Sequence, residues 1–403
     1  MPEAVIVAAT RSPIGRANKG SLVEMRPDDL AAQVVEAALA QVPQLDRNDV
    51  EDLLMGCGQP AGESGYNIGR VVAILAGMPD VPGTTVNRYC SSSLQTSRMA
   101  MHAIKAGEGD VFISAGVETV SRFLVGMSDG APGSTNGLFN DAMARTAERS
   151  GEGSSSWEPP AGLPDVYIAM GQTAENVRQL KGVARDRMDE FAANSQQRAV
   201  AAQERGFFER EITPITLPDG TVVSKDDGPR PGTTKEKLSE LKPVFRPDGE
   251  VTAGNACPLN DGAAAVIVMS DTKAKELGLT PLARIVATGV SGLSPEIMGL
   301  GPVEAVKKAL GYAKMSISDI DLFEINEAFA VQVLGSARDL GIDEDKLNVS
   351  GGAIALGHPF GMTGARITAT LLNNLSTHDK TFGVETMCVG GGQGMAMVVE
   401  RLS

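Results

Sequence analysis

The sequence predicts an α/β fold made of two duplicated halves with a segment inserted between them. Strand-like and helix-like patterns alternate over the first third of the 403 residues and again from residue 281 onward. Similar strand segments recur at a constant offset, because those beginning at Asp49 and Val111 match those beginning at Asp319 and Thr381, 270 positions later. The region between the halves is instead rich in Gly, Pro and Ser. Alternating strands and helices are typical of βαβ units and a helix-covered sheet.

The first half begins with a strand and then alternates. Short runs rich in Val, Ile and Leu indicate strands, and longer stretches with apolar residues every three or four positions indicate helices. Strands are expected at 3–10, 50–57 and 110–118, and helices at 28–42, at 67–77 and from Ser91 to a stop at Gly107.

The second half repeats this rhythm. Strands are expected at 282–290, 319–326, 381–389 and 393–401, and helices at 302–313 and 327–341. A tandem duplication places the counterpart of the loop at Cys90 near position 360, within the stretch GGAIALGHPFGMTG at 351–364.

The middle region has a different organisation. Three Gly-, Pro- and Ser-rich stretches interrupt a long helical pattern at 184–206, whose apolar stripe predicts packing against the core rather than a free linker. We therefore divide the chain into a first half (1–119 with 253–280), an insertion (120–252) and a second half (281–403).

Composition excludes several classes of function. A net charge of −14 argues against sequence-independent nucleic-acid binding, and 4% aromatic residues against stacking platforms for single strands. The four cysteines are widely spaced without a CxxC pair, which favours free thiols in a reducing cytoplasm over disulfides or a zinc site. The N-terminal apolar run is too short for a signal or membrane-spanning segment.

Cys90 stands where a short β-prone run gives way to a helix. Unpaired backbone N–H groups and the helix dipole favour a negative charge there, so the sequence predicts a reactive thiolate at this position. A buried, inert cysteine is the alternative, and a base near Cys90 would decide between them.

Only three histidines could supply that base. His102 lies in a Met-rich helix and His378 in a polar loop, which indicates structural or solvated roles. His358 is surrounded by glycines that permit unusual backbone angles and close approach to a substrate, and is the predicted functional imidazole.

Two further stretches carry candidate groups. Cys388 ends a strand that runs into three glycines, so its thiol and several backbone N–H groups face one space where an oxyanion could bind. Asn326 falls between a strand and a helix and is either an N-cap or a polar group directed at a substrate. Cys57 and Cys257 are expected to be structural or pocket-lining.

Five motifs together resemble the thiolases. They are VNRYCSSSLQT, TAGNACPLNDGAAAVIVMS, INEAFA, GGAIALGHPFGMTGAR and MCVGGGQG, in the order found in that family. Thiolases cleave or form 3-ketoacyl-CoA. The resemblance implies a fold of two βαβαβαββ halves with helix-covered mixed sheets and an inserted, CoA-binding loop domain.

The resemblance also implies roles for individual residues. Cys90 is similar to the nucleophile that forms a thioester, and His358 to its base. Cys388 resembles the second thiol that moves protons. Asn326 resembles the residue that holds a water in one oxyanion hole, and the backbone N–H groups of Cys90 and Gly390 resemble a second hole.

Coenzyme A and acyl-CoA enter as substrates, with no metal and no further cofactor implied. Residues at the positions of family CoA contacts are Met170, Arg230, Ala253, Cys257 and Phe329. The family often has serine where Cys257 stands, which removes one expected hydrogen bond to the pantetheine arm.

A few residues distinguish the degradative from the acetoacetyl-specific members of the family. Acetoacetyl-specific members usually carry HMG where this chain has Ala169, Met170 and Gly171. We therefore expect a degradative 3-ketoacyl-CoA thiolase of fatty acid β-oxidation, with acetyl-CoA acetyltransferase as the alternative. A non-catalytic CoA- or lipid-binding relative is the alternative from another class, and the retained Cys90, His358 and Cys388 argue against it. The resemblance implies a homodimer or homotetramer.

Overall fold

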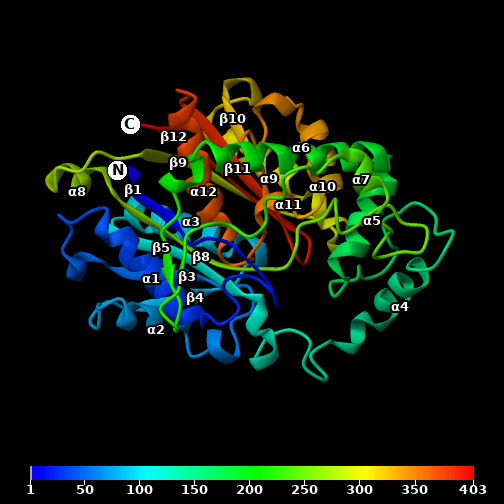
Figure 1. The fold of residues 1–403 in the computed structure, drawn as a ribbon, viewed down its shortest axis with the longest axis horizontal. Coiled ribbons are helices and arrows are strands. Elements are labelled where there is room, and N and C mark those ends of the chain that lie inside the picture. Colours follow the sequence, from blue (N-terminus) through cyan, green and yellow to red (C-terminus); the bar gives the residue numbers. More distant parts are fainter. Residues whose placement is uncertain (1) are drawn as a thin grey trace.

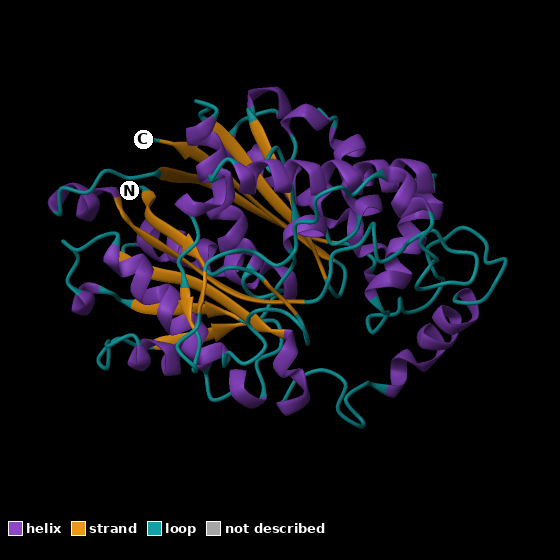
Figure 2. Cartoon of the chain, viewed as in Figure 1, coloured by secondary structure: helices purple, strands orange, loops and turns teal. Residues whose placement is uncertain are grey.

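The structure, a computed structural model, describes residues 2–403 and contains one large mixed sheet with helices on its faces (Figure 1 and Figure 2). The strands of the first half are β1 (Ala4–Arg11), β3 (Asp52–Gly56), β4 (Gly83–Val86), β5 (Val111–Thr119) and β8 (Asn260–Ser270). Those of the second half are β9 (Ala283–Gly292), β10 (Leu322–Ile325), β11 (Phe382–Val389) and β12 (Gln393–Arg401). The short β2 (Gly15–Arg16) pairs with β8, and β6 (Ile215–Thr216) pairs with β7 (Val222–Val223) apart from the main sheet.

The strand order confirms the duplication. The first half runs β4-β3-β5-β8-β1 and the second β10-β11-β12-β9. Leu347 bridges Phe323 in parallel beside β10, at the place that β4 occupies in the first half. In each half the outer strands are parallel, while β8 and β12 are antiparallel to both of their neighbours. The two halves join where β1 pairs with β9.

The helices form layers around the two halves of the sheet. Those of the first half are α1 (Pro27–Ala40), α2 (Ile68–Leu75), α3 (Ser92–Ala106) and α8 (Asp271–Glu276). Those of the second half are α9 (Gly301–Ala313), α10 (Ala330–Leu340), α11 (Ala353–Leu356) and α12 (Thr363–Thr377). Those of the middle region are α4 (Asn140–Arg149), α5 (Met170–Lys181), α6 (Arg185–Glu204) and α7 (Lys235–Ser239).

The core shows which helices cover which face. Along β1, Val5 and Val7 pack in one cluster with α1 and α2, whereas Ala4 and Ile6 pack in a second cluster. This alternation is expected because successive strand side chains point to opposite faces. The second cluster also holds apolar residues of α3, α12 and the second half of the sheet, so α3 and α12 lie between the two half-sheets. A third cluster joins the other face of the second half to α9, α10, α5 and α6.

The ends of α3 and α12 place the loops that matter for function. α3 ends as predicted, since Gly107 has a φ of +77°, a left-handed conformation that glycine adopts without strain. At the other end, the first turns of α3 and α12 touch: Ala365 N donates to Ser93 Oγ at 3.0 Å, and a Cβ on Gly364 would lie 2.3 Å from Leu94 N. Cys90 and His358, which precede these two helices, are thereby brought to one region.

Burial in this sheet raises the pKa of several carboxyl groups above the usual value. Glu385 on β11 is fully buried; Thr368 donates to its Oε1 at 2.7 Å, and its Oε2 has no hydrogen-bond partner among residues 2–403. Burial raises the pKa of Glu385 from 4.5 to about 8, and that of Glu324 on β10 also to about 8. The raised pKa favours the protonated form of both side chains near neutral pH.

We expect the free energy of unfolding to fall as pH rises from about 4.5 to about 8, because the folded chain keeps a proton on Glu385 that the unfolded chain releases. The Glu385→Gln variant has no proton to lose at this position, so its stability should depend less on pH over this range. We expect a difference on the order of 3 kcal/mol between the two ends of the range, measured by urea unfolding. The exposed Glu304→Gln serves as the control. An equal slope in Glu385→Gln and wild type would contradict a protonated Glu385.

No helix among residues 2–403 is both long enough and apolar enough to cross a membrane.

Candidate active site

Cys90 lies in a single 3₁₀ turn, Tyr89–Ser91, directly before α3. Tyr89 has a φ of +42°, which is uncommon for a bulky residue and indicates local strain of the kind found at functional sites. Arg88 N donates to Ser92 Oγ at 2.9 Å, and Ser92 Oγ donates to Tyr89 O at 2.7 Å, so this turn is held by its own side chains. The predicted position of Cys90 at the start of a helix is confirmed.

The pKa of Cys90 does not favour the predicted resting thiolate. Burial raises the pKa of the Cys90 thiol to about 12, while the backbone amides of Gly390 and Cys90 beside the sulfur lower it by less. The sequence argument counted the helix start and omitted desolvation, which is the larger effect here. Cys90 is therefore a neutral thiol in the resting protein.

The turn of Cys90 and the turn of Gly390 lie against each other. They come from segments 300 positions apart in the chain, one before α3 and one in the glycine-rich turn after β11. A Cβ added to Gly390 would lie 3.4 Å from the Tyr89 ring and 3.9 Å from Met170 Sδ, so Gly390 faces both residues. Two backbone amides beside a sulfur can stabilise an oxyanion that forms on a carbon bonded to it.

His358 is buried in the loop before α12, and its hydrogen bonds determine which ring nitrogen carries the proton. Thr363 Oγ1 donates to Pro359 O at 2.8 Å and lies 2.6 Å from His358 Nδ1. Because the hydroxyl proton is used on Pro359, Nδ1–H donates to Thr363, and Nε2 keeps a free lone pair. Burial lowers the pKa of His358 to about 3, and the charge of Arg366 lowers it further. The ring is a neutral base at physiological pH.

Asn326 faces that ring. Its Nδ2 lies 3.3 Å from His358 Nε2, while its Oδ1 makes no hydrogen bond within the described part of the chain. The N-cap alternative is wrong, because α10 begins at Ala330 and Phe329 occupies the N-cap position. Gln332 Nε2 donates to Asn326 O at 2.7 Å and holds its backbone.

Cys388 is fully buried on β11, close to the other thiols. Burial raises the pKa of Cys388 well above its usual value, and negative charge on Cys90 or Cys257 would raise it further. Three cysteines of the chain therefore share one region. No hydrogen bond joins Cys90, His358 and Cys388 to one another among residues 2–403.

The residues at CoA-contact positions divide into two groups. Met170 lies against Gly390, and Cys257 N donates to Ala328 O at 3.0 Å, beside the bridge between Ala256 and Phe329. These three side chains, Met170, Cys257 and Phe329, belong to the apolar cluster that contains Cys388.

Arg230 and Ala253 lie apart from that group and are exposed. Arg230 N donates to Gln196 Oε1 at 2.8 Å, and Gln196 in turn donates to Ile354 O in α11, so Arg230 sits over the segment that leads to His358. Burial of part of the side chain and the charge of Arg16 lower the pKa of Arg230.

Sequence reasoning missed three residues. Thr363 orients His358, and its signal was a hydroxyl residue five positions after the histidine. Phe245 packs edge-on against Phe329 with ring centroids 6.1 Å apart, and a Cβ on Gly171 would overlap it. Glu118 ends β5, where an acid at the carboxyl end of a buried strand was the available signal.

Glu118 ties two loops of the site together. It accepts hydrogen bonds from Gly58 N at 2.8 Å, Gln59 N at 3.1 Å and Gly361 N at 2.9 Å. Burial raises the pKa of Glu118 to about 7. Cys57, buried beside it with Sγ 3.8 Å from Glu118 Oε1, is structural as expected.

Comparison with known proteins agrees with this arrangement. A family model described as "Thiolase, N-terminal domain" matches residues 4–272, and one described as "Thiolase, C-terminal domain" matches residues 279–401. A β-ketoadipyl-CoA thiolase of Acinetobacter baylyi is 43% identical over the full length of both chains. A 3-ketoacyl-CoA thiolase of Aeromonas hydrophila is 45% identical, also over the full length of both.

Solved structures give the same result. An acetyl-CoA acetyltransferase of Bacillus anthracis superposes with a TM-score of 0.85 at 39% identity, covering 100% of this chain and 99% of that one. The dimeric peroxisomal thiolase of Saccharomyces cerevisiae superposes with a TM-score of 0.88 at 37% identity, covering 99% and 98%. With both family models matched and full-length relatives above 40% identity, this chain belongs to the thiolase family of acyltransferases.

Proposed function

We propose that the protein is a 3-ketoacyl-CoA thiolase that cleaves 3-ketoacyl-CoA with CoA, giving acetyl-CoA and a shortened acyl-CoA, in fatty acid β-oxidation. CoA and acyl-CoA are its substrates, and the reaction needs no metal or further cofactor. The observation that carries the proposal is that the turn of Cys90 lies against the turn of Gly390 and also against the start of α12, which follows His358. Relatives named 3-ketoacyl-CoA thiolase support the substrate class.

The first half-reaction forms an S-acyl-cysteine. Cys90 Sγ attacks the 3-keto carbon while its proton passes to His358 Nε2, and the N–H groups of Cys90 and Gly390 bind the developing oxyanion. Because both Cys90 and His358 are neutral at rest, the proton moves as the sulfur attacks rather than before. When the oxyanion collapses, the bond between C2 and C3 breaks and acetyl-CoA leaves as its enolate.

The enolate is then protonated. Asn326 and His358 face the space where its thioester oxygen would lie, and Cys388 gives its proton to C2. Buried thiols hold their protons until a strong base forms beside them, so Cys388 donates to a carbanion but does not ionise at rest.

The second half-reaction restores the enzyme. Cys388 thiolate takes the proton of the CoA thiol, whose sulfur attacks the S-acyl group on Cys90. Cys90 leaves as a thiolate and recovers its proton from His358. Met170, Arg230, Ala253, Cys257 and Phe329 are the proposed contacts for CoA.

Acetyl-CoA acetyltransferase is the second candidate, favoured by the likeness to the Bacillus anthracis structure. Thiolysis of acetoacetyl-CoA and of a longer 3-ketoacyl-CoA by the purified protein separates the two. A higher kcat/KM on the longer substrate supports the degradative thiolase, and cleavage of acetoacetyl-CoA alone supports the acetyltransferase. Cleavage of neither by the folded protein would favour a non-catalytic CoA-binding relative.

We further propose a cytoplasmic homodimer or homotetramer. The similar yeast thiolase is described as dimeric. Light scattering of the purified protein gives the subunit number, and a monomer would contradict the proposal.

We expect Thr363→Val to lower kcat about 10- to 100-fold, because the buried Nδ1–H of His358 loses its acceptor and the ring loses its fixed tautomer. KM should change little, since Thr363 is buried behind the histidine. Thr363→Ser retains the hydroxyl and should restore most of the activity. If Thr363→Ser is as slow as Thr363→Val, the effect comes from packing and not from the hydrogen bond.

A further inference from the structure

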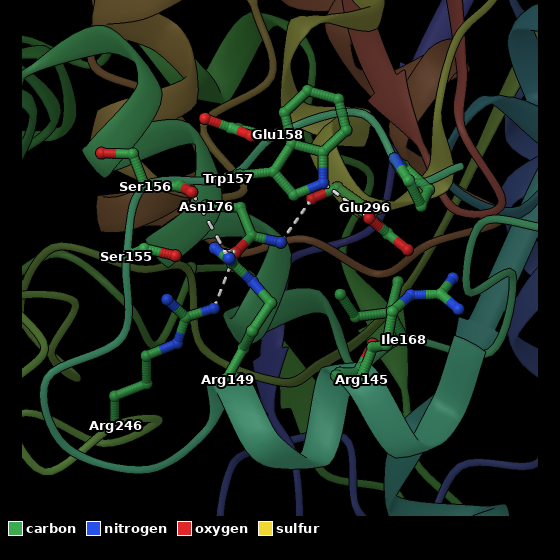
Figure 3. A pocket seen from close by; sticks show the side chains of 12 residues that line it. Arg145, Arg149, Ser155, Ser156, Trp157, Glu158, Ile168, Asn176, Arg246 and Glu296 are labelled. Atoms are coloured by element: carbon green, nitrogen blue, oxygen red, sulfur yellow. Dashed lines mark hydrogen bonds between the residues drawn. The ribbon is translucent and has the colours of Figure 1, made fainter. Parts of the chain in front are cut away.

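A cavity of about 160 Å³ lies in the middle region, apart from the cysteine site (Figure 3). Its wall is formed by the end of α4, one face of α5 and the loops at residues 155–168, and none of the residues of the cysteine site lines it. Three arginines line it, Arg145, Arg149 and Arg246; Arg149 and Arg246 lie together at Asn176, whereas Arg145 Nη2 donates to Leu163 O.

Arg246 carries a buried charge that forms no direct ion pair among residues 2–403, although Glu175 and Asp248 lie close enough to raise its pKa. Arg246 is 4% exposed. Its guanidinium donates to neutral oxygens, chiefly Gln172 Oε1 and Asn176 Oδ1, both at 2.7 Å. No carboxylate within residues 2–403 forms an ion pair with it. Burial lowers the pKa of Arg246; Glu175 opposes this effect, and the nearby Arg149 adds to it.

Arg149 brings a second positive charge to the same place. Its Nη2 donates to Asn176 Oδ1 at 3.1 Å, so the two arginines share one amide oxygen (Figure 3). Its Nε is buried and has no hydrogen-bond partner in the part of the chain that the structure describes. Arg145 lies one turn earlier on α4 and lines the same cavity.

Arg11 shows how the chain can neutralise such a charge, whereas the buried Arg366 forms no ion pair among residues 2–403. Arg11, which is fully buried, pairs with Glu211 at 2.7 Å and Asp226 at 2.8 Å. The acids in the cavity wall do not do this for Arg149 and Arg246. Glu296 is occupied by Trp157 Nε1 at 2.6 Å and by a backbone N–H, and Glu158 is exposed. Two close guanidinium groups without a directly paired carboxylate are costly to bury unless an anion binds.

We propose that this cavity is a binding site for a carboxylate or similar small oxyanion, held between Arg149 and Arg246. A carboxylate accepts two hydrogen bonds from a guanidinium fork and replaces neutral acceptors with a charged one. Ser155 and Ser156 at the rim offer further hydroxyl donors.

The anion has two sources. α5 begins at Met170 beside Gly390, and Asn176 lies six residues further, on the order of 9 Å along the helix axis. This is a short span for an acyl chain, so one source is the terminal carboxylate of a dicarboxylic 3-ketoacyl-CoA. That source rests on the function proposed above. The other source is a free anion from solution.

Trp157 provides a direct test, because it is the only tryptophan of the chain and lines the cavity. Titration with adipate or phosphate at constant ionic strength should change its fluorescence saturably in wild type. Arg149→Gln should raise the apparent Kd at least about tenfold, since a guanidinium fork is lost. Arg338→Gln, which removes an exposed arginine of α10, should bind like wild type. No saturable change in wild type, or the same Kd in Arg149→Gln, would overturn the site.

Two substrates of equal length distinguish the sources. If the substrate supplies the anion, Arg149→Gln lowers kcat/KM about tenfold on 3-ketoadipyl-CoA and leaves it unchanged on 3-ketohexanoyl-CoA. If both substrates react as in wild type while the fluorescence response is lost, the anion is a free one. Absence of all thiolysis would refute the proposed function and leave the fluorescence titration as the test of the cavity.

Discussion

Cys90→Ala is expected to abolish thiolysis, with a loss of kcat on the order of 10⁴-fold or more, because the acyl group has no sulfur to receive it. The turn at residue 90 is held by the hydrogen bonds of Ser92, which do not involve the sulfur, so the fold and substrate binding should persist. Initial rates measure the loss of kcat. The mass of the protein after incubation with 3-ketoacyl-CoA in the absence of CoA shows whether the acyl group is transferred to it. Wild type should gain the mass of one acyl group, and Cys90→Ala should not.

Cys57→Ala is the matched control, since it removes another thiol whose partner is Glu118 rather than the proposed oxyanion donors. It should still form the acyl-enzyme. An acyl adduct on Cys90→Ala would show that a different thiol is the nucleophile, and Cys388 would be the first to examine.

His358→Gln is expected to lower kcat by about 10²- to 10⁴-fold, because no other side chain takes the proton from Cys90. The pH profile tests the same role with a definite sign. Neutral imidazole is the active form, and the pKa of His358 is lowered to about 3, so kcat should not fall on the acid side through protonation of this ring until pH approaches 3. Rates over the pH range in which the protein stays folded give the measurement.

His102→Gln is the control, because His102 lies exposed on α3 and should be replaceable without effect. A loss of activity in wild type with a midpoint near pH 6.5 that disappears in His358→Gln would contradict a histidine held neutral by burial.

Periodicity and motif positions predicted the architecture well. The offset of 270 positions placed the loop of His358 correctly, and the observed strand order repeats in both halves. Two central elements, β8 and α12, were not predicted from the sequence. β8 is buried on both faces, so its AAAVIVMS run has no alternation, and α12 lies between the half-sheets and has polar residues such as Thr368 and Thr370 inside the core.

The protonation states of the site residues were harder to predict than which residues form the site. Asn326 lies beside His358, and Cys388 lies near Cys90, yet the sequence did not predict the raised pKa of Cys90 because desolvation depends on everything packed around the thiol. The arginine cavity could not be predicted either. Arg149 and Arg246 are 97 positions apart and meet only because α4 and the loop after α7 both pack against α5.

The contact between the first turns of α3 and α12 bears on how such a site could arise. A single ancestral half would carry one such helix, and a second copy related by a twofold axis would supply the other. In that symmetric pair any residue in one loop is repeated in the other, so both loops would carry the same side chains. Joining the copies in one chain removed that restriction. Cys90 and His358 could then diverge into a nucleophile and its base.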